Sequence, residues 1–505
     1  MPKRGDSMAK VPEVRIRELN TQPVRDERDW VIHWMIAYRR TRSNFALQRA
    51  VEWARELDKP LLVFEALRAG YRWANDRIHR FVIEGMADNE AELRDLPARY
   101  YAYVERRPGD GKGLLEALAE RACVVVTDDF PGFFLPHMIE AAGKKLDVRL
   151  EAVDSNGLLP MRATRRVFAT AFSFRTFLKK NLHEHLEHFP LKDPLAQKLK
   201  PPISLPPALL RRWSAPTRKL LEGDSRALSE LEIDHEVEPV DGFRGGSKAA
   251  HARLRFFIRK LLPDYSTARN IMHVDGTSKL SPWLHFGHIG SHEILDAVAR
   301  HEGRGRALEP KATAKQRNMF GLSPGAEAFL EQLTVWRELG FNMASHRDYA
   351  TRFDSLPAWA QKTLKEHAKD PRPRLQSRFD LEQGTTDDPM FNAAQRQLRE
   401  EGWFHNYARM VWGKKILEYS KSPEDALETM AELMNRYSLD GRDPNSTTGF
   451  FWVLGRYDRA WGPERPIFGK VRFMTSDTPD KLRKYREYIE RYAPDTFEEK
   501  TTGKR

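Results

Sequence analysis

The chain has 505 residues, of which 40% are hydrophobic, and its formal net charge is +12 at pH 7. The length favours at least two domains, and the hydrophobic fraction excludes wholesale disorder. The positive charge favours a polyanionic partner, with a basic protein that lacks one as the alternative. The single cysteine, Cys123, excludes a disulfide framework and a four-cysteine iron–sulfur cluster.

The N-terminal residues predict no targeting or membrane segment. Residues 1–26 are polar and basic without periodicity, so we expect a disordered basic arm. They lack the apolar stretch of a signal peptide, and no apolar run reaches the roughly 18 residues that cross a bilayer. We therefore expect a soluble, cytoplasmic protein.

Residues 27–155 alternate short apolar runs with amphipathic segments. Runs rich in β-branched residues predict strands at 30–38, 60–67, 123–129 and 148–154. Helices are predicted between them, near 43–57, 74–96, 112–122 and 134–144. This alternation predicts an α/β domain built on a doubly wound parallel sheet with helices on both faces. No GxGxxG motif follows the first strand, so a dinucleotide fingerprint is absent.

Residues 156–245 are expected to be a connector. Their proline-rich part, LKPPISLPPALLRR, predicts an irregular path across the surface. His183, His185 and His188 lie together in NLHEHLEHFP, but HExxH spacing is missing. A solvated or packed helix face is therefore favoured over a metal site, and no metal is assigned.

Residues 246–492 place apolar side chains at three- and four-residue spacings and predict a mainly α-helical domain, followed by a disordered tail at 493–505. Within this domain, residues 387–474 combine many aromatic side chains with Arg, Lys, Asp and Asn. A plain surface would not need so many tryptophans, and a plain core would not need so many charges.

Local signals divide the 387–474 stretch further. Asn392 is predicted to cap a helix that stops at Gly402, and a second helix is expected at about 403–420. Ser422-Pro423 begins a third helix. After Tyr437 the periodicity is lost, which predicts a long ordered loop, and such loops are usually functional.

These residues resemble the C-terminal flavin domain of the photolyase/cryptochrome superfamily, and are most like class II cyclobutane pyrimidine dimer (CPD) DNA photolyases. The matching motifs are DPMFNAAQ, EGWFHNYARMVWGKKILE, LDGRDPN, DRAWG and RPIFGKVRFM, with YSTARN (265–270) and GTSKLSPWLHFGHI (276–289) earlier in the chain. The resemblance covers most of residues 28–490. It implies a monomer with an N-terminal antenna domain, FAD as cofactor and UV-damaged DNA as partner. It leaves open a second antenna chromophore of folate or deazaflavin type.

The resemblance also implies which residues bind FAD. They are Tyr265, Arg269, Thr277, Ser278, Lys279, Leu280, Ser281, Leu284, Arg409 and Asp440. The run TSKLS offers hydroxyl and N–H groups to the diphosphate, although helix caps are the ordinary role of such residues. Arg409 and Asp440 are expected to pair beside the flavin ring, where a cation stabilises an anionic reduced flavin. An ordinary surface ion pair is the alternative.

The implied substrate is a pyrimidine dimer flipped out of DNA and split by an electron from light-excited reduced FAD. Trp336 and Trp452 are expected to stack on the lesion, with core packing as the alternative. Cationic side chains are expected to contact DNA phosphates, namely Arg456, Arg459, Arg465, Lys470 and Arg472. The residues assigned to catalysis are Gln332, Asn406, Trp412 and Met434.

Several positions depart from the class II pattern. Gln332 stands where Glu is usual, and an amide can donate a hydrogen bond but no acidic proton. Met434 stands where the family has Asn, and Tyr457-Asp458 replaces His-Asp before the AWG turn. The chain of three tryptophans that photoreduces FAD reads Trp412, Phe391, Tyr419, so Trp403 or an outside reductant becomes an alternative electron source.

These departures favour a cryptochrome-like blue-light photoreceptor as the alternative to a repair enzyme. A light-independent flavin or nucleic-acid binding module is a further alternative.

Overall fold

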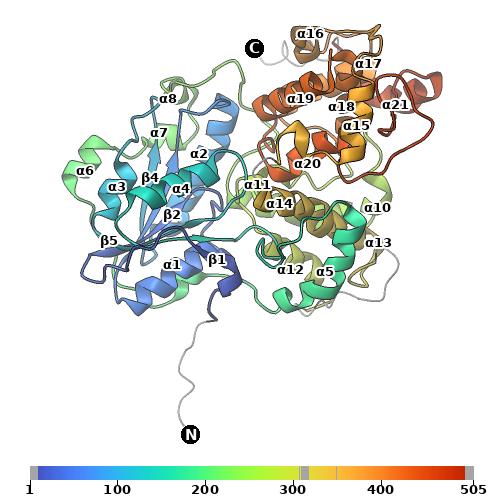
Figure 1. Cartoon of the computed structure of the whole chain (residues 1–505). Helices are drawn as coiled ribbons and strands as arrows, with labels where there is room; N and C mark the ends of the chain where they lie inside the picture. The colour runs from blue at the N-terminus through green and yellow to red at the C-terminus, as the bar shows by residue number, and fades with distance from the viewer. Residues whose placement is uncertain (1–8, 306–307, 309–317, 348–349, 495–505) are drawn as a thin grey trace.

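The computed structural model describes residues 9–305, 308, 318–347 and 350–494, and places a six-stranded sheet before a mainly helical region. The strands are β1 (Ile16–Glu18), β2 (Trp30–Met35), β3 (Leu61–Leu67), β4 (Arg99–Val104), β5 (Ala122–Asp128) and β6 (Leu150–Val153). Their order is β1-β6-β5-β2-β3-β4, with β1 antiparallel to β6 and the other pairs parallel. The predicted fold class, an α/β domain followed by a helical domain, is confirmed (Figure 1).

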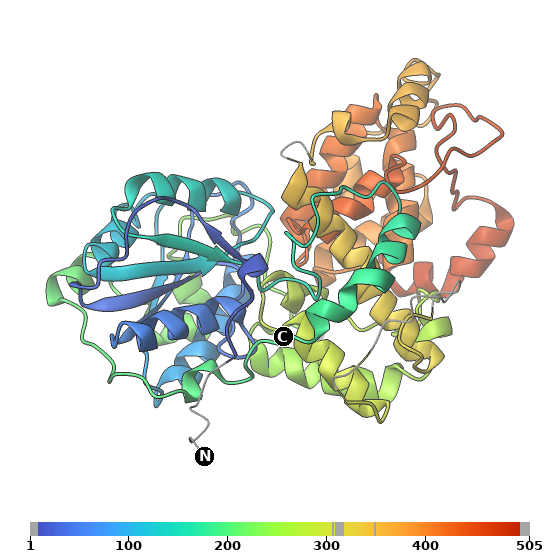
Figure 2. The ribbon, with the colours of Figure 1, turned by 60° about the horizontal axis from the view of Figure 1, so that its bottom comes forward.

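Helices cover both faces of the sheet (Figure 2). On one face, side chains of β2, β3 and β5 pack with α1 (Phe45–Glu56). On the other face, alternate residues of the same strands pack with α3 (Leu114–Ala119) and α4 (Leu135–Lys145). Helix α2 (Asp76–Leu93) lies on the α1 face, where it covers Ala102 and Val104 of β4. Because successive side chains of a strand point to opposite faces, a continuous apolar run such as CVVV serves both layers.

Part of the expected N-terminal arm is ordered, and this prediction was wrong from residue 9 onward. A 3₁₀ turn at Glu13–Arg15 leads into β1, which completes the edge of the sheet. The Arg15 guanidinium is buried and donates hydrogen bonds to the carbonyls of Gly157 and Leu158. Since these partners lie about 140 positions away, local composition could not reveal them. Residues 1–8 lie outside the described residues.

The helical region begins earlier than expected. Helix α5 (Ala171–Leu186) falls within the expected connector, yet its Phe174 and Leu178 belong to the same buried cluster as Leu330 and Leu339. The connector beyond α5 contains three short helices, α6 (Pro207–Arg212), α7 (Arg218–Leu221) and α8 (Ser225–Leu228). The other domain boundaries stay predictions.

The helical region continues to Arg491. Its helices are α9 (Ser247–Phe256), α10 (Tyr265–Ala268), α11 (Ser281–His285), α12 (Ser291–His301), α13 (Pro324–Glu331), α14 (Arg337–His346), α15 (Ala358–Glu366), α16 (Arg378–Gln383), α17 (Pro389–Glu401), α18 (Asn406–Tyr419), α19 (Pro423–Tyr437), α20 (Pro444–Val453) and α21 (Pro479–Arg491). Two π-helical turns interrupt it, η3 (Phe257–Leu261) and η4 (Gln332–Trp336). Among the described residues, no helix has the length and apolar character needed to cross a membrane.

Helix caps within 387–474 differ in part from the predictions. Asp388, not Asn392, caps α17, because its side chain accepts the Phe391 N–H. Gly402 ends this helix in the left-handed conformation, as expected. The expected loop after Tyr437 contains α20, which Asp443 caps. Asp followed by Pro is itself a helix-start signal, and the prediction gave it too little weight.

Arg77 of α2 joins the two domains by capping helices of the other one. Its guanidinium donates to the carbonyls of Leu398 and Arg399 in the last turn of α17, and of Tyr437 at the end of α19. Carbonyls in the last turn of a helix lack partners within the helix. Burial lowers the Arg77 pKa to about 10, still well above neutral pH. A fixed cation therefore satisfies both helix ends at once.

We expect Arg77→Met to lower the free energy of unfolding by ~2–4 kcal/mol, because the carbonyls of Arg399 and Tyr437 lose this donor at the two helix ends. The matched control is Arg80→Met on the same helix, where a half-exposed arginine loses its i,i+4 pair with Glu84, which keeps the Gly245 N–H as a donor, and the expected cost is below ~1 kcal/mol. Urea unfolding followed by circular dichroism measures both. Equal effects of the two changes would contradict the capping role.

Candidate functional site

A cavity in the helical region brings together most of the residues that sequence analysis selected. Of those assigned to FAD, all but Leu280 line it. Gln332 of η4 and Asn406 at the start of α18 line it as well. The walls also contain residues that sequence analysis missed, namely Phe329, Leu333, Arg337, Phe404, Asp443 and Asn445, together with Trp403, which it had raised only as an electron donor. Side chains more than 160 positions apart in the sequence therefore share one cavity.

Arg409 and Asp440 form an ion pair in the cavity wall. One guanidinium nitrogen of Arg409 lies 2.9 Å from each carboxylate oxygen of Asp440. The Ser438 hydroxyl donates to the same carboxylate at 2.6 Å. Burial alone would raise the pKa of Asp440, but Arg409 and hydrogen bonds from Ser281 and Ser438 hold it below its usual range. The pair is thus charged at neutral pH, and its burial distinguishes it from the alternative of an exposed surface pair.

The loop before α11 supplies a polar end to the cavity. The Thr277 hydroxyl oxygen is buried, with no hydrogen-bond partner in the described part of the chain. Lys279 adopts a left-handed backbone conformation, and its ammonium lies 5.1 Å from the centre of the Trp403 ring. Arg253 of α9, which sequence analysis missed, fixes the loop by donating to the carbonyls of Thr277 and Ser278.

Two of the residues assigned to catalysis lie behind the cavity rather than in its wall. Trp412 is 2% exposed and donates its indole N–H to Gln395. Its ring meets Phe404, a lining residue, edge to face at 5.6 Å between ring centres. Met434 is buried near the end of α19, and Leu280 is likewise buried outside the lining. Their roles stay predictions.

The further aromatic residues form a separate pair. Phe391 and Tyr419 meet edge to face at 5.8 Å, and the Tyr419 hydroxyl donates to Asp387. Burial, with nearby Asp388 and Asp387, raises the pKa of this phenol far above its usual value. The hydrogen bond gives the phenolic proton an acceptor.

The two tryptophans expected to stack on a lesion, Trp336 and Trp452, are both half-buried and lie outside the set that lines the cavity. Trp336 is the last residue of the η4 π-turn, a type of irregularity that is frequent at functional sites. Trp452 lies near two cations, Lys414 and Arg472, at 5.4 and 5.5 Å from its ring centre.

The predicted phosphate contacts divide into two groups. Arg459, Arg465 and Lys470 are exposed, and Arg472 is half-buried in an ion pair with Asp458. Arg456 is different, and its prediction as a phosphate contact was wrong. Its guanidinium is buried against the Phe451 ring and donates to the carbonyl of Ala350 and the hydroxyl of Ser355.

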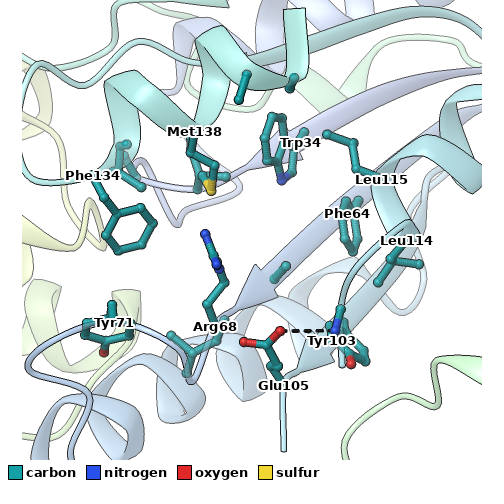
Figure 3. Close-up of a pocket in the computed structure, with 18 of the residues that line it drawn as sticks. Trp34, Phe64, Arg68, Tyr71, Tyr103, Glu105, Leu114, Leu115, Phe134 and Met138 are labelled. Atoms are coloured by element: carbon teal, nitrogen blue, oxygen red, sulfur yellow. Dashed lines mark hydrogen bonds between the residues drawn. The ribbon is translucent and has the colours of Figure 1, made fainter. Parts of the chain in front are cut away.

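A larger cavity, of about 530 Å³, lies in the α/β domain (Figure 3). Aromatic side chains that include Trp34 and Phe64 project into it, and Arg68 extends its guanidinium toward the centre. Glu105 stands at its edge and accepts N–H groups of Gly109 and Gly111. The sequence had predicted no pocket here.

One short wall separates the two cavities. His285 lines the larger cavity, and its Nδ1–H donates to the carboxylate of Asp443, which lines the smaller one, at 3.2 Å. Arg442, the neighbour of Asp443, also lines the larger cavity. The turn that follows Asp440 therefore contributes to both.

Comparison with known proteins gives one consistent family. No protein-family model matches the chain. The deoxyribodipyrimidine photo-lyase of Methanothermobacter thermautotrophicus is 33% identical over 479 residues, which cover 94% of this chain and 97% of that protein. The deoxyribodipyrimidine photo-lyase of Arabidopsis thaliana is 30% identical over 459 residues, with 88% and 85% covered.

Solved structures share the fold. A class III photolyase from Agrobacterium tumefaciens and a cryptochrome from Synechocystis each superpose with a TM-score of 0.64 at 17% identity, over 93% of this chain and 87% and 89% of theirs. At that identity the superpositions speak for the fold alone. Together with the near full-length relatives and the motifs gathered around one cavity, they establish that this chain belongs to the photolyase/cryptochrome family.

Proposed function

We propose that this protein is a light-dependent DNA photolyase of class II type, which splits cyclobutane pyrimidine dimers in UV-damaged DNA with FAD as its cofactor. The observation that carries the proposal is the buried Arg409–Asp440 pair in the wall of a cavity that nine of the ten residues assigned to FAD line. The near full-length relatives named as photo-lyases support it.

The residues of the cavity fit FAD. The unpartnered Thr277 hydroxyl, with Lys279 and Arg269, suits a diphosphate. Trp403 and Phe404 provide apolar walls for aromatic rings. When bound and reduced, FAD supplies the light absorption and the single electron that opens the cyclobutane ring.

The chain's own part is to position groups and set the local charge. The Arg409 guanidinium, held by Asp440, presents a fixed cation that favours negative charge on a neighbouring ring. Gln332 and Asn406 place amide N–H donors in the same wall, where they can hydrogen-bond carbonyl groups of a bound lesion. Gln332 can orient such a carbonyl but cannot protonate it.

The larger cavity is the candidate place for a second chromophore. Its aromatic and aliphatic walls suit a flat ring system, and Arg68 offers a cation to an acidic group. Folate and deazaflavin both carry such features, and the chemistry of the walls favours neither.

A cryptochrome-like photoreceptor is the second candidate. It is favoured by the residues behind the cavity, where Trp412 packs on Phe404 but the family's other two tryptophans are replaced by the separate pair Phe391 and Tyr419. Phenylalanine is hard to oxidise, so electron transfer along this route to the cofactor has to bypass Phe391.

The repair assay tests the proposal directly. We expect reduced protein under blue light to restore absorbance near 260 nm to oligothymidine that contains dimers. Arg409→Gln should slow repair by at least ~tenfold, because charge stabilisation is lost and Asp440 stays buried without its cation. Arg483→Gln, on exposed α21, is the matched control and should repair normally.

The possible failures of this assay have different meanings. Unchanged damage in a yellow, flavin-bound protein would replace repair by the photoreceptor candidate. Purified protein that never binds flavin would overturn both candidates.

Photoreduction tests the aromatic path. Blue light on oxidised protein with dithiothreitol should bleach the flavin band, and Trp412→Phe should slow bleaching by at least ~tenfold, because the residue next to Phe404 no longer gives up an electron readily. Trp403→Phe is the comparison, since Trp403 also lines the cavity. Normal bleaching in the Trp412 variant and loss in the Trp403 variant would move the electron source to Trp403.

Lys414 of α18 supports the region of Trp452 from inside the protein. It is fully buried, and its ammonium donates to the Val453 carbonyl at 2.5 Å. Burial lowers its pKa to about 7, with Asp458 acting in the opposite direction and Arg472 adding to the effect. No carboxylate of the described residues lies within ion-pair distance of it.

This pKa implies a pH dependence of stability. An unfolded lysine binds its proton up to about pH 10.5, whereas the folded one releases it near pH 7, so the unfolded state holds more protons in between. We therefore expect the free energy of unfolding to rise by up to ~2 kcal/mol between pH 7 and 9, and Lys414→Met to remove this rise. Lys362→Met, an exposed lysine on α15, should keep it. Urea unfolding at several pH values measures the slope, and an unchanged slope in Lys414→Met would contradict the assignment.

A further inference from the structure

A third cavity, of about 390 Å³, lies where the α/β domain, the connector and the helical domain meet. It shares no lining residue with the two cavities described above. Its lining residues come from the segment after β2, the end of α2, the segment before Asp193, and helices α9 and α12. They are Arg40, Thr41, Arg42, Glu92, Lys192, Ser247, Lys248, His251, Arg255 and Glu293.

Positive charge dominates these walls, with five cationic side chains against two carboxylates. Both carboxylates already have donors within the protein. Glu293 accepts from the Gly290 N–H and pairs with His251, and Glu92 accepts the Thr41 hydroxyl. They are therefore poorly placed to neutralise the cations at the mouth.

Three of these cations have no carboxylate partner. Lys192, Lys248 and Arg255 are exposed at the rim and form no ion pair in the part of the chain that the structure describes. Lys248 and Arg255 lie seven residues apart on α9, so they project from the same side of that helix. Like charges gathered without counter-charges repel one another, and a bound anion would relieve that repulsion.

The floor of the cavity is rigid and carries the Arg40 guanidinium, which lies 3.7 Å from Glu293. Arg40 is 3% exposed, and its guanidinium donates to the carbonyls of Ser43, Ser155 and Gly287. The Ser247 hydroxyl is held by the His288 carbonyl. A hydrogen bond to Glu293 raises the pKa of His251, which extends its charged form toward neutral pH. A buried guanidinium at the floor and long, exposed cationic side chains at the rim together suit a multivalent anion.

The lining also limits the kind of anion. It contains no Phe, Tyr or Trp, and the His251 imidazole is its one ring, so a nucleobase would find little surface to stack on. The cavity is recessed, and the cations expected to contact DNA belong to the 459–472 segment rather than to this one. We propose that this cavity binds a compact polyanion that carries two or more phosphate groups and is recognised by its phosphates alone.

Inorganic tripolyphosphate is the probe for this site. Titration calorimetry with flavin-loaded protein at low salt should give saturable binding, and ATP should bind about equally because its base gains no contact. Lys248→Glu/Arg255→Glu should weaken tripolyphosphate binding by at least ~tenfold, since two attractive charges become repulsive. The matched control is Lys219→Glu/Arg226→Glu, an identical charge change at exposed positions of α7 and α8, with less than ~twofold effect.

Three results would overturn the proposal. The first is that both double variants weaken tripolyphosphate binding equally, which would mean general attraction to a basic protein. The second is that ATP binding depends on its base. The third is that the protein does not bind tripolyphosphate and that Lys248→Glu/Arg255→Glu loses affinity for damaged DNA, which would assign these cations to DNA. The flavin absorbance and thermal unfolding midpoint of each variant show whether it is folded. The neutral double variant Lys248→Gln/Arg255→Gln changes the net charge less, and it should show an intermediate loss of tripolyphosphate affinity.

Discussion

Buried arginines that are hydrogen-bonded to main-chain carbonyls hold this molecule together. Arg15, Arg40 and Arg77 each bury a guanidinium and donate to carbonyls of distant segments. A buried cation is costly unless its donors are satisfied, so each of these side chains fixes the segments that supply its acceptors. Arg77 fixes two helix ends of the other domain, and Arg40 reaches from the segment after β2 to Gly287.

The same constraint is solved differently at the candidate site. Arg409 donates to the Phe404 carbonyl, but its charge is neutralised by a carboxylate, that of Asp440. Asp440 belongs to the turn after α19, and the next residues of that turn, Arg442 and Asp443, line the larger cavity and the smaller one respectively. Arg442 again donates to carbonyls, those of Asn435, Ser438 and Leu439. One tightly bonded turn therefore shapes the smaller cavity and limits the cavity of the α/β domain, which ties the geometry of one to the other.

The positions that depart from the class II pattern are well packed. Phe391 and Tyr419 are both fully buried and meet edge to face, and the Tyr419 hydroxyl has a carboxylate partner. Asn435, next to the substituted Met434, uses its side chain to accept the Arg442 N–H. Three of the departures from the class II pattern, Phe391, Tyr419 and Met434, are thus built into the core.

The sequence by itself determined the fold class, four of the six strands, several helix ends such as Gly402, and the set of polar residues around one cavity. These features follow from local periodicity, capping chemistry and long ordered motifs, all of which are properties of neighbouring residues. Tertiary structure alone decided that Arg15 is buried and completes the N-terminal edge, that Arg456 packs inward on Phe451, and that Lys414 lies beneath Trp452. Local sequence alone predicts that an arginine or lysine is exposed on the surface. Whether it is solvated, bound to carbonyls or placed beside an aromatic ring depends on partners tens to hundreds of positions away, and only the folded chain brings those partners within hydrogen-bond distance.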